Sequence, residues 1–203
     1  TRLSRGLGDV YKRQIVINGR EVMDRVKRER DRFVGFVLEG VDEIPAEDKI
    51  AGYAKFVDNN TLMVDDHTQI TAKRIVIATG SRPAYPGVWN ELGDRLVIND
   101  DVFDWDVLPE SVAVFGPGVI GLELGQALHR LGVKVKLFGL GGQVGPLTDP
   151  EVMAYADKAF KEEFYLDADV KVESMQRIEG EDKVEIQFIN HDGELETFIV
   201  DYV

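Results

Sequence analysis

The sequence predicts an α/β fold in which a doubly wound parallel sheet is followed by a β-meander. The apolar run SVAVF (111–115), a helical stretch (118–131) and the apolar run VKVKLF (133–138) follow one another in the order of a parallel βαβ unit. Three glycines lie between the first run and the helix. Residues 183–190 alternate between apolar and polar side chains, which is typical of an antiparallel strand with one exposed face.

The first half of the chain is expected to combine a long helix with a small antiparallel sheet. From Arg20 to about Glu43, apolar residues recur at steps of four or seven, and charges fill most of the other face. Pro45 then ends the helix. The stretches DNN (58–60) and DDH (65–67) are rich in turn-forming residues, so strands are expected on either side of each.

A different kind of strand is expected at RIVIATG (74–80). Its unbroken apolar run predicts a strand buried on both faces, as in a layered α/β sheet. The polar, proline-containing stretch 82–95 then reads as a connector. We therefore predict two domains, 15–105 and 106–203, with the second truncated at its C-terminal end.

After the βαβ unit the sequence predicts a second helix over 149–164. Asp149 is expected to cap this helix, with Pro150 at its first position. The stretch NHDGE (190–194) predicts a hairpin turn. Three further strands are expected, near 165–178, at 183–190 and at 196–203.

The composition limits the kinds of partner that the chain is expected to bind. The chain of 203 residues has 24 basic and 37 acidic residues, a formal net charge of −13, so phosphate backbones and anionic lipid surfaces should repel it. It has no cysteine, and its three histidines form no ligand pattern, so no metal site is expected. No apolar run is long enough to span a bilayer. We expect a cytoplasmic protein that binds neither nucleic acid nor membranes.

The first fourteen residues differ in charge from the rest of the chain. Residues 1–14 carry four basic side chains against one acid, and SRGLGDVYKRQ (4–14) resembles a translated sequencing-adapter peptide. We interpret this segment as non-native and leave it out of the fold prediction.

The glycine stretch has the spacing G-x-G-x-x-G of a dinucleotide-binding turn. Between a strand and a helix, Gly116 would permit the tight bend, Gly118 would let backbone N–H groups approach a pyrophosphate, and Gly121 would let helix and strand pack closely. The phosphate charge would lie at the helix N-terminus. This context predicts a Rossmann-like NAD(P)-binding domain; the alternative is a glycine-rich turn that binds no ligand.

The residues that would identify the coenzyme are missing. Gly139 stands where an acid for the ribose hydroxyl, or an arginine near a 2′-phosphate, is expected. Lys134 and Lys136 on the preceding strand could contact a phosphate, but they are expected to face solvent. Glu123 on the helix can be read as an acid favoured by the helix dipole, or as a residue facing a cofactor. NAD and NADP therefore both remain open.

Two motifs together resemble a known family. The stretch IVIATGSRP (75–83), followed by SVAVFGPGVIGLELG (111–125), is similar to the pyridine nucleotide–disulfide oxidoreductases, most of all to their dihydrolipoamide dehydrogenase branch. The stretches GYAKF (52–56) and DPEV (149–152) extend the resemblance. It implies a flavoenzyme that passes electrons between a dithiol, FAD and NAD(P), with the cofactors supplying the redox chemistry.

The resemblance also implies which residues lie near the cofactors. The ATG motif would close the part of an FAD-binding domain contained in 15–105, and the glycine turn would hold NAD(P), with Ile120 and Glu123 near the nicotinamide and flavin. It assigns Ala54, Ala78, Thr79, Gly80 and Ser81 to FAD, and Gly116, Gly118, Val119, Ile120, Gly121, Glu123 and Gly139 to NAD(P).

Several features of the family are absent. The C-x4-C redox pair has no counterpart, and neither has the first, FAD-binding G-x-G-x-x-G. No catalytic residue is therefore assigned. We expect an internal, inactive fragment of an enzyme that acts on a small-molecule or lipoyl dithiol and forms a homodimer through a missing C-terminal domain. The alternative is a non-catalytic NAD(H)-binding or redox-sensing module, which the lack of cysteine favours if the chain is complete.

Overall fold

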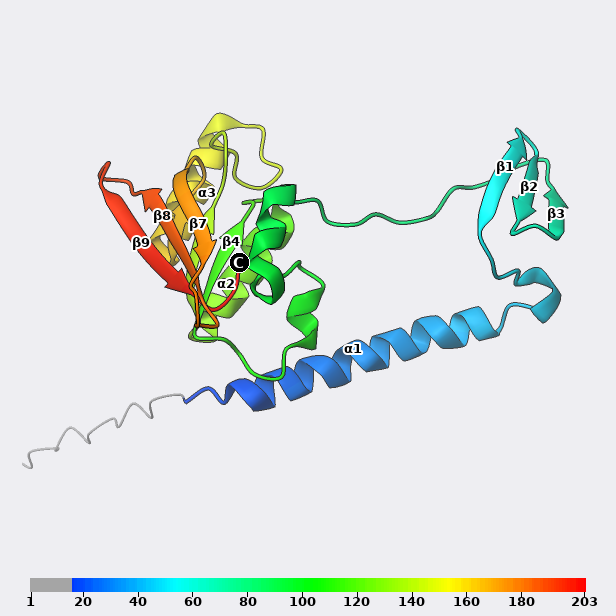
Figure 1. Cartoon of the computed structure of the whole chain (residues 1–203), viewed down its shortest axis with the longest axis horizontal. Helices are drawn as coiled ribbons and strands as arrows, with labels where there is room; N and C mark the ends of the chain where they lie inside the picture. Colours follow the sequence, from blue (N-terminus) through cyan, green and yellow to red (C-terminus); the bar gives the residue numbers. More distant parts are fainter. Residues whose placement is uncertain (1–15) are drawn as a thin grey trace, which may run out of the picture. The chain divides into compact units, whose positions relative to one another are not determined.

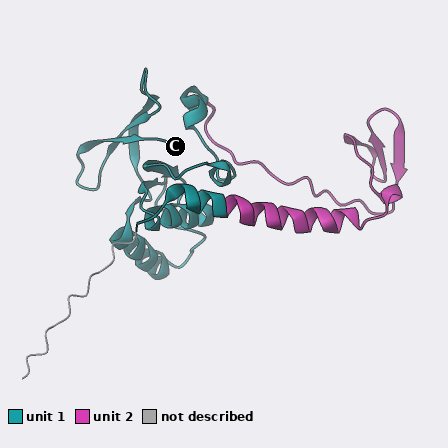
Figure 2. Ribbon diagram, turned by 90° about the horizontal axis from the view of Figure 1, so that it is seen from below, with its two compact units in different colours: residues 1–25, 88–203 teal, residues 26–87 magenta. Residues whose placement is uncertain are grey.

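A computed structural model describes residues 16–203, so the interpretation of residues 1–14 lies outside the described residues. The chain divides into two compact units (Figure 2): residues up to 25 with 88–203, and residues 26–87. The division falls at 87/88 rather than after residue 105. Residues 88–105, which include most of the predicted connector, therefore cluster with the second half of the chain.

A three-stranded parallel sheet forms the centre of the larger unit (Figure 1). Its strands are β4 (Ser111–Phe115), β5 (Lys134–Phe138) and β6 (Tyr165–Asp167), in the order β4-β5-β6. Helix α2 (Val119–Arg130) joins the first two strands and α3 (Pro150–Glu163) precedes the third. The predicted alternation of strands and helices, and with it the α/β fold, is confirmed.

Helices α2 and α3 are linked to each other, and α2 packs on the sheet. A Cβ atom on Gly125 would lie 3.3 Å from the Leu137 side chain, so helix and strand approach closely there. Gln126 and Arg130 of α2 both donate hydrogen bonds to the Glu163 carboxylate of α3, Gln126 at 2.7 Å. The predicted cap of α3 is confirmed as well, because Asp149 Oδ1 accepts hydrogen bonds from two backbone N–H groups of the first turn.

An antiparallel sheet packs against the parallel sheet. Its strands are β7 (Lys171–Arg177), β8 (Val184–Ile189) and β9 (Leu195–Val200), joined in that order, with the predicted turn at 190–194. Alternate residues of β8 are fully buried, as their pattern predicts. The core between the sheets consists of Leu92, Ala113, Phe138, Val170, Val184, Ile186, Phe188, Val200 and Val203.

The last residues leave the antiparallel sheet and join the parallel one. Tyr202 forms a parallel bridge with Val112, and its carbonyl oxygen accepts a hydrogen bond of 3.0 Å from Ala113 N. The single strand predicted over 196–203 is therefore wrong: β9 ends at Val200. Because the chain crosses between sheets here, β4 has β5 on one side and Tyr202 on the other.

The stretch predicted as a connector contains the 3₁₀-helical segment η2 (Gly87–Arg95), and a second such segment, η3 (Asp101–Asp104), follows it. Trp89 lies against Phe115 with ring centroids 4.8 Å apart, and Trp105 stacks on Tyr202 at 5.2 Å. These aromatic contacts attach the segment to β4 and to the C-terminal residues.

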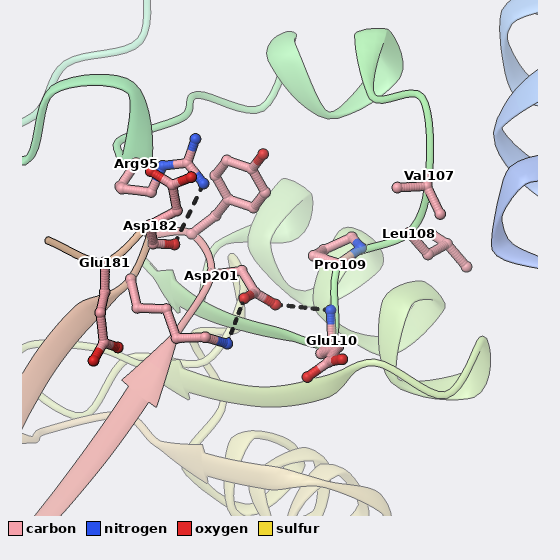
Figure 3. A pocket seen from close by; sticks show the side chains of 10 residues that line it. Arg95, Val107, Leu108, Pro109, Glu110, Glu181, Asp182 and Asp201 are labelled. Carbon is pink, nitrogen blue, oxygen red and sulfur yellow. Dashed lines mark hydrogen bonds and ion pairs between the residues drawn. The ribbon is translucent and has the colours of Figure 1, made fainter. Parts of the chain in front are cut away.

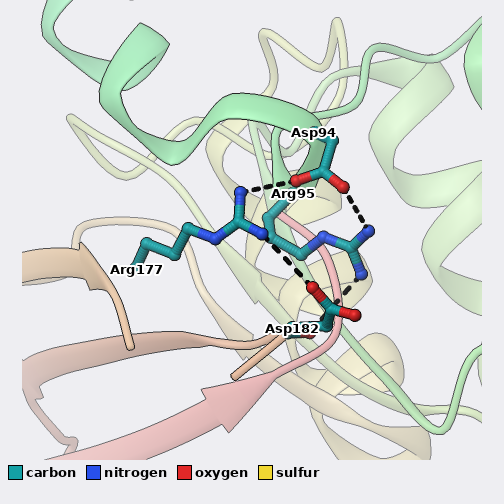
Figure 4. Close-up of polar contacts among 4 residues, drawn as sticks. All are labelled: Asp94, Arg95, Arg177 and Asp182. Atoms are coloured by element: carbon teal, nitrogen blue, oxygen red, sulfur yellow. Dashed lines mark hydrogen bonds and ion pairs between the residues drawn. The ribbon is translucent and has the colours of Figure 1, made fainter. Parts of the chain in front are cut away.

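Four charged residues fasten η2 to the β7–β8 hairpin (Figure 4). The Asp94 carboxylate accepts hydrogen bonds from Arg95 at 2.7 Å and from Arg177 at 2.6 Å. Arg177 also pairs with Asp182, 3.2 Å away. The two guanidinium groups lower the pKa of Asp94, with Arg95 contributing most. The carboxylate therefore stays ionised between them.

The smaller unit is mostly helix and hairpin. Helix α1 (Gly19–Asp42) begins in the larger unit and continues through η1 (Ala46–Asp48) to the strands β1 (Ala54–Asp58), β2 (Thr61–Val64) and β3 (Thr68–Thr71). The strands form an antiparallel meander in the order β1-β2-β3. The predicted helix and the two turns are confirmed.

The buried strand predicted over 74–80 does not form. The stretch 74–80 has no regular secondary structure, and its Val76 and Ile77 side chains are 86% and 71% exposed. A strand of a parallel sheet needs neighbouring strands and a layer on each face. In the described chain, neither β1–β3 nor any other strand pairs with this segment. The apolar run identified a segment suited to burial but not the elements that would bury it.

Candidate functional site

The glycine stretch forms the turn between β4 and α2. Gly116 has φ +105°, a left-handed conformation that suits glycine. Its N–H donates to the Phe138 carbonyl at 2.8 Å, which anchors the turn to β5. A Cβ atom on Gly121 would lie 2.0 Å from the Gly116 carbonyl oxygen, so no other residue fits there. The bend and the close approach expected of Gly116 and Gly121 are both present in the backbone.

The same turn leaves space for an anion at the start of α2. Gly118 is the N-cap residue of α2, and no side chain caps the helix. The first N–H groups of an α-helix lack partners within the helix, and its dipole favours negative charge there. Added Cβ atoms at Gly116 and Gly118 would meet no atom within 4 Å. The turn therefore fits a pyrophosphate: the backbone is open on the side where the helix presents its donors.

Three predicted site residues of α2 line its exposed side. Val119 is 49% and Ile120 54% exposed, although both are apolar. Glu123 is exposed too and lies in the second turn of the helix, one residue beyond the first. Its position weakens the helix-dipole explanation, because that effect fades after the first turn.

The loop after β5 lies against the glycine turn. Gly139 is buried, and a Cβ atom there would lie 2.6 Å from Pro117 Cγ and 2.7 Å from the Ala168 carbonyl oxygen. Further along, Gly145 N donates to the Pro117 carbonyl at 2.6 Å. The structure thus brings the predicted Gly139 next to the turn, and it shows why a side chain is excluded at that position.

Sequence reasoning missed two acids at the same edge of the sheet. Asp167 ends β6 and Asp169 follows it, and Asp169 Oδ1 accepts a hydrogen bond of 2.7 Å from Gly141 N. Because β5 and β6 are parallel, the loops after them meet at the carboxyl edge. The signal was the pair of acids at the carboxyl end of the third parallel strand, a position that the search for an acid after β5 did not cover.

Lys136 does not face solvent, which corrects the prediction. Its side chain is 16% exposed, and its ammonium group pairs with Glu196 of β9. It lies 4.0 Å from the ring centroid of Tyr165 and 4.9 Å from that of Phe188. The antiparallel sheet covers this face of β5, so a charge on it must be paired or placed over aromatic rings.

The residues assigned to FAD lie in the smaller unit. Ala54 begins β1 and is exposed, as are Ala78, Thr79 and Ser81 in the irregular stretch. Gly80 has φ +71°, and an added Cβ would meet no atom within 4 Å. These residues are open to contact, and their assignment to FAD stays a prediction.

A separate pocket opens at the amino end of β4 (Figure 3). Arg95, Glu110, Lys183 and Asp201 are among its lining residues. Asp201 Oδ2 accepts hydrogen bonds from the backbone N–H groups of Glu110 and Ser111 at 2.8 and 2.9 Å, and its other oxygen pairs with Lys183. Because the glycine turn follows the carboxyl end of β4, this pocket is not part of the predicted dinucleotide site.

A comparison with protein families identifies the family to which a chain with this glycine turn belongs. Residues 15–203 match the model of the pyridine nucleotide-disulphide oxidoreductases. The chain belongs to this family. Enzymes of this family use FAD and NAD(P), which agrees with the cofactors that the motifs predict.

The relatives differ in activity. A soluble pyridine nucleotide transhydrogenase of Mycobacterium bovis (strain BCG / Pasteur 1173P2) is 36% identical over 111 residues, which are 52% of this chain and 24% of that protein. A dihydrolipoyl dehydrogenase of Vibrio parahaemolyticus is 29% identical, over 68% of this chain and 30% of its own length. A mercuric reductase of Lysinibacillus sphaericus is 31% identical, over 73% and 27%. The chain therefore spans less than a third of the length of these relatives.

Solved structures show the same fold. The HOCl-induced flavoprotein disulfide reductase RclA from Escherichia coli superposes with a TM-score of 0.69 at 20% identity, over 88% of this chain and 41% of that one. At this identity the likeness establishes the fold alone. Within residues 16–203, no helix combines the length and apolar character that crossing a membrane requires.

Proposed function

We propose that residues 106–203 bind the nicotinamide coenzyme of an FAD-dependent disulfide oxidoreductase, and that residues 15–105 supply part of its FAD-binding domain. The proposal rests on the Gly116–Gly121 turn. A Cβ atom at Gly118 would meet no atom within 4 Å, which leaves room for a ligand, whereas a Cβ atom at Gly121 would clash with the Gly116 carbonyl oxygen. The whole protein would pass electrons between a dithiol or disulfide, FAD and NAD(P), as the dihydrolipoamide dehydrogenase branch does.

In that enzyme, FAD and the nicotinamide carry the hydride and electron chemistry. The chain's own residues bind and position the coenzyme. The N–H groups of Gly118 and of the start of α2 would hold the pyrophosphate, and Gly116 would supply the tight bend. Val119, Ile120 and Glu123 form the exposed side of the helix that a cofactor would meet. Ala54 and Ala78–Ser81 would contact FAD.

The chain by itself is proposed to be inactive with dithiols. Thiol–disulfide exchange needs a cysteine thiolate, and the 203 residues contain no cysteine. If the chain is complete, the same fact favours the second candidate, a module that binds NAD(H) without turnover. Sequencing the flanking DNA separates the two: an upstream G-x-G-x-x-G with C-x4-C supports the oxidoreductase, and a start codon near residue 15 supports the module.

The proposal is tested with the complete 203-residue chain. NADH and NADPH are titrated by the change in their fluorescence, and the purified protein is examined for flavin absorbance and lipoamide turnover. We expect binding of a dinucleotide, no bound flavin and no turnover. Absence of binding for both coenzymes would overturn the proposed site, and a yellow protein would overturn the expectation for FAD.

A variant that keeps the fold sharpens this test. Gly118 has φ −75°, and a Cβ there meets no atom, so Gly118→Ala should fold normally. Its methyl group would occupy the space in which the pyrophosphate approaches the backbone, so binding should weaken at least tenfold. Gly87→Ala is the matched control, because it also adds a methyl group in open space but lies outside the turn.

A further inference from the structure

The end of β5 cannot hold the acid that commonly binds the ribose of a dinucleotide. Gly139 directly follows β5, and an added Cβ would meet both the Pro117 ring and the Ala168 carbonyl oxygen at less than 3 Å. One of these groups belongs to the glycine turn and the other to the backbone after β6. A carboxylate side chain at position 139 would therefore require the backbone to shift.

Another carboxylate is held beside this position. Asp169 is exposed, and its Oδ1 accepts the Gly141 N–H at 2.7 Å. Its own N–H donates to Asp167 Oδ1 at 3.1 Å. Two more backbone bonds, from Gly139 N to the Asp167 carbonyl and from Gly142 N to the Ala168 carbonyl, join the two loops. Asp169 thus belongs to the same hydrogen-bonded edge of the sheet as the glycine turn.

The charge at this edge is negative. The stretches 139–149 and 165–170 contain no lysine or arginine. Among the described residues, His191 pairs with Asp167 at 3.7 Å and Lys171 pairs with Glu173 at 2.5 Å. No cation of the described chain pairs with Asp169. The N–H groups of the three loop glycines nearest to it, Gly139, Gly141 and Gly142, already donate to oxygen atoms.

We propose that Asp169 replaces the missing acid after β5 as the acceptor for the adenosine ribose hydroxyls, and that the chain therefore selects NAD(H) over NADP(H). Asp169 Oδ1 is held by Gly141, which leaves Oδ2 as an acceptor for a hydroxyl group. A 2′-phosphate would bring its negative charge next to the carboxylates of Asp169 and Asp167, and neither 139–149 nor 165–170 contains a lysine or arginine to receive it. This inference rests on the proposed dinucleotide site and specifies its coenzyme.

The experiment compares NADH and NADPH titrations of the complete chain at low salt. We expect NADH to bind at least tenfold more tightly. In Asp169→Asn, the amide oxygen can still accept from Gly141 N–H while the charge is lost, so the preference should fall about tenfold. Asp192→Asn is the control: it removes the same charge from an exposed turn at 190–194 and should leave the preference unchanged.

The outcomes separate this inference from the proposed function. Equal or tighter binding of NADPH, or an unchanged preference in Asp169→Asn, would overturn the role of Asp169 while the dinucleotide site stands. Failure of both coenzymes to bind would overturn the site itself. A Gly139→Asp variant with unchanged thermal unfolding and tighter NADH binding would show that the ribose acceptor belongs after β5 and not at Asp169.

Discussion

Residues 88–203 and residues 26–87 both contain amphipathic helices and strands. In the first region other elements bury the apolar faces, and in the second most of the apolar side chains stay exposed. In the larger unit, α2 packs on one face of the parallel sheet and the antiparallel sheet on the other. Among residues 26–87, Val64 is the single buried hydrophobic side chain, at 3% exposure. Helix α1 shows the contrast best, because Phe33 and Val37 of its predicted apolar face are 61% and 67% exposed.

Periodicity and burial are therefore separate properties of a sequence. A repeat at helical spacing makes one face of a helix apolar, but burial requires another element with a complementary face. The larger unit contains such partners within its own sequence.

The largest difference is expected from truncating a phenylalanine in each unit. Phe138 is fully buried and contacts Phe115 and Phe188, so Phe138→Ala should destabilise the larger unit by about 3–5 kcal/mol. Phe33→Ala in α1 should change the free energy of unfolding by less than about 0.5 kcal/mol. Amide hydrogen exchange resolved by residue measures both. A comparable loss from Phe33→Ala would show that α1 is covered in solution.

Glycine-to-alanine changes should have opposite signs in the two helices. Gly121→Ala forces a Cβ against the Gly116 carbonyl and should cost about 1–3 kcal/mol and remove dinucleotide binding. Gly35 lies inside α1, where a Cβ meets no atom within 4 Å, so Gly35→Ala should stabilise that helix by about 0.5–1 kcal/mol. Circular dichroism melting and NADH titration measure these effects. If Gly121→Ala left both unchanged, the close approach in the turn would be wrong.

Removing the partly buried Asp201 carboxylate should make the larger unit less stable in a pH-dependent way. Burial raises the pKa of Asp201, but hydrogen bonds from Lys183 and from the N–H groups of Ser111 and Glu110 outweigh it, so the pKa lies below its usual range. A lowered folded-state pKa adds stability above the unfolded pKa, and this stability is lost as pH falls through the folded value.

Asp201→Asn should therefore cost about 1–3 kcal/mol at pH 7, and the cost should shrink as the pH falls below about 4. Urea unfolding at pH 7 and pH 3 measures it. In the smaller unit Asp65 accepts the Tyr53 N–H at 2.9 Å, but its side chain is 40% exposed, so Asp65→Asn should cost less. A cost for Asp201→Asn that did not depend on pH would contradict the role of its charge.

The smallest effects are expected for ion pairs. A double-mutant cycle of Lys136→Met and Glu196→Gln should give a coupling of about 1 kcal/mol, because the ammonium group is mostly buried. Lys158 and Glu162 on α3 are 74% and 69% exposed, and their coupling should be below about 0.5 kcal/mol. Chemical denaturation of the four variants of each cycle measures both. Equal couplings would show that the antiparallel sheet does not shield Lys136.

Local sequence was sufficient for most elements and for the glycine turn. The strand 111–115, the cap at Asp149 and the hairpin turn at 190–194 depend on neighbouring residues, and each forms as predicted. The spacing of Gly116, Gly118 and Gly121 likewise predicted a backbone geometry that is set within a few residues. These features depend on conformational preferences and hydrogen bonds inside one turn or one element.

Which faces of the helices and strands are buried, and which loops lie side by side, depends on the tertiary structure. It placed Lys136 under the antiparallel sheet, left 74–80 without a neighbouring strand, and carried the chain at Asp201 from one sheet to the other. It also brought Asp169 beside the Gly139 position, 30 residues away in sequence, through the parallel pairing of β5 and β6. Contacts between distant segments depend on how layers pack, and a local pattern does not contain that information.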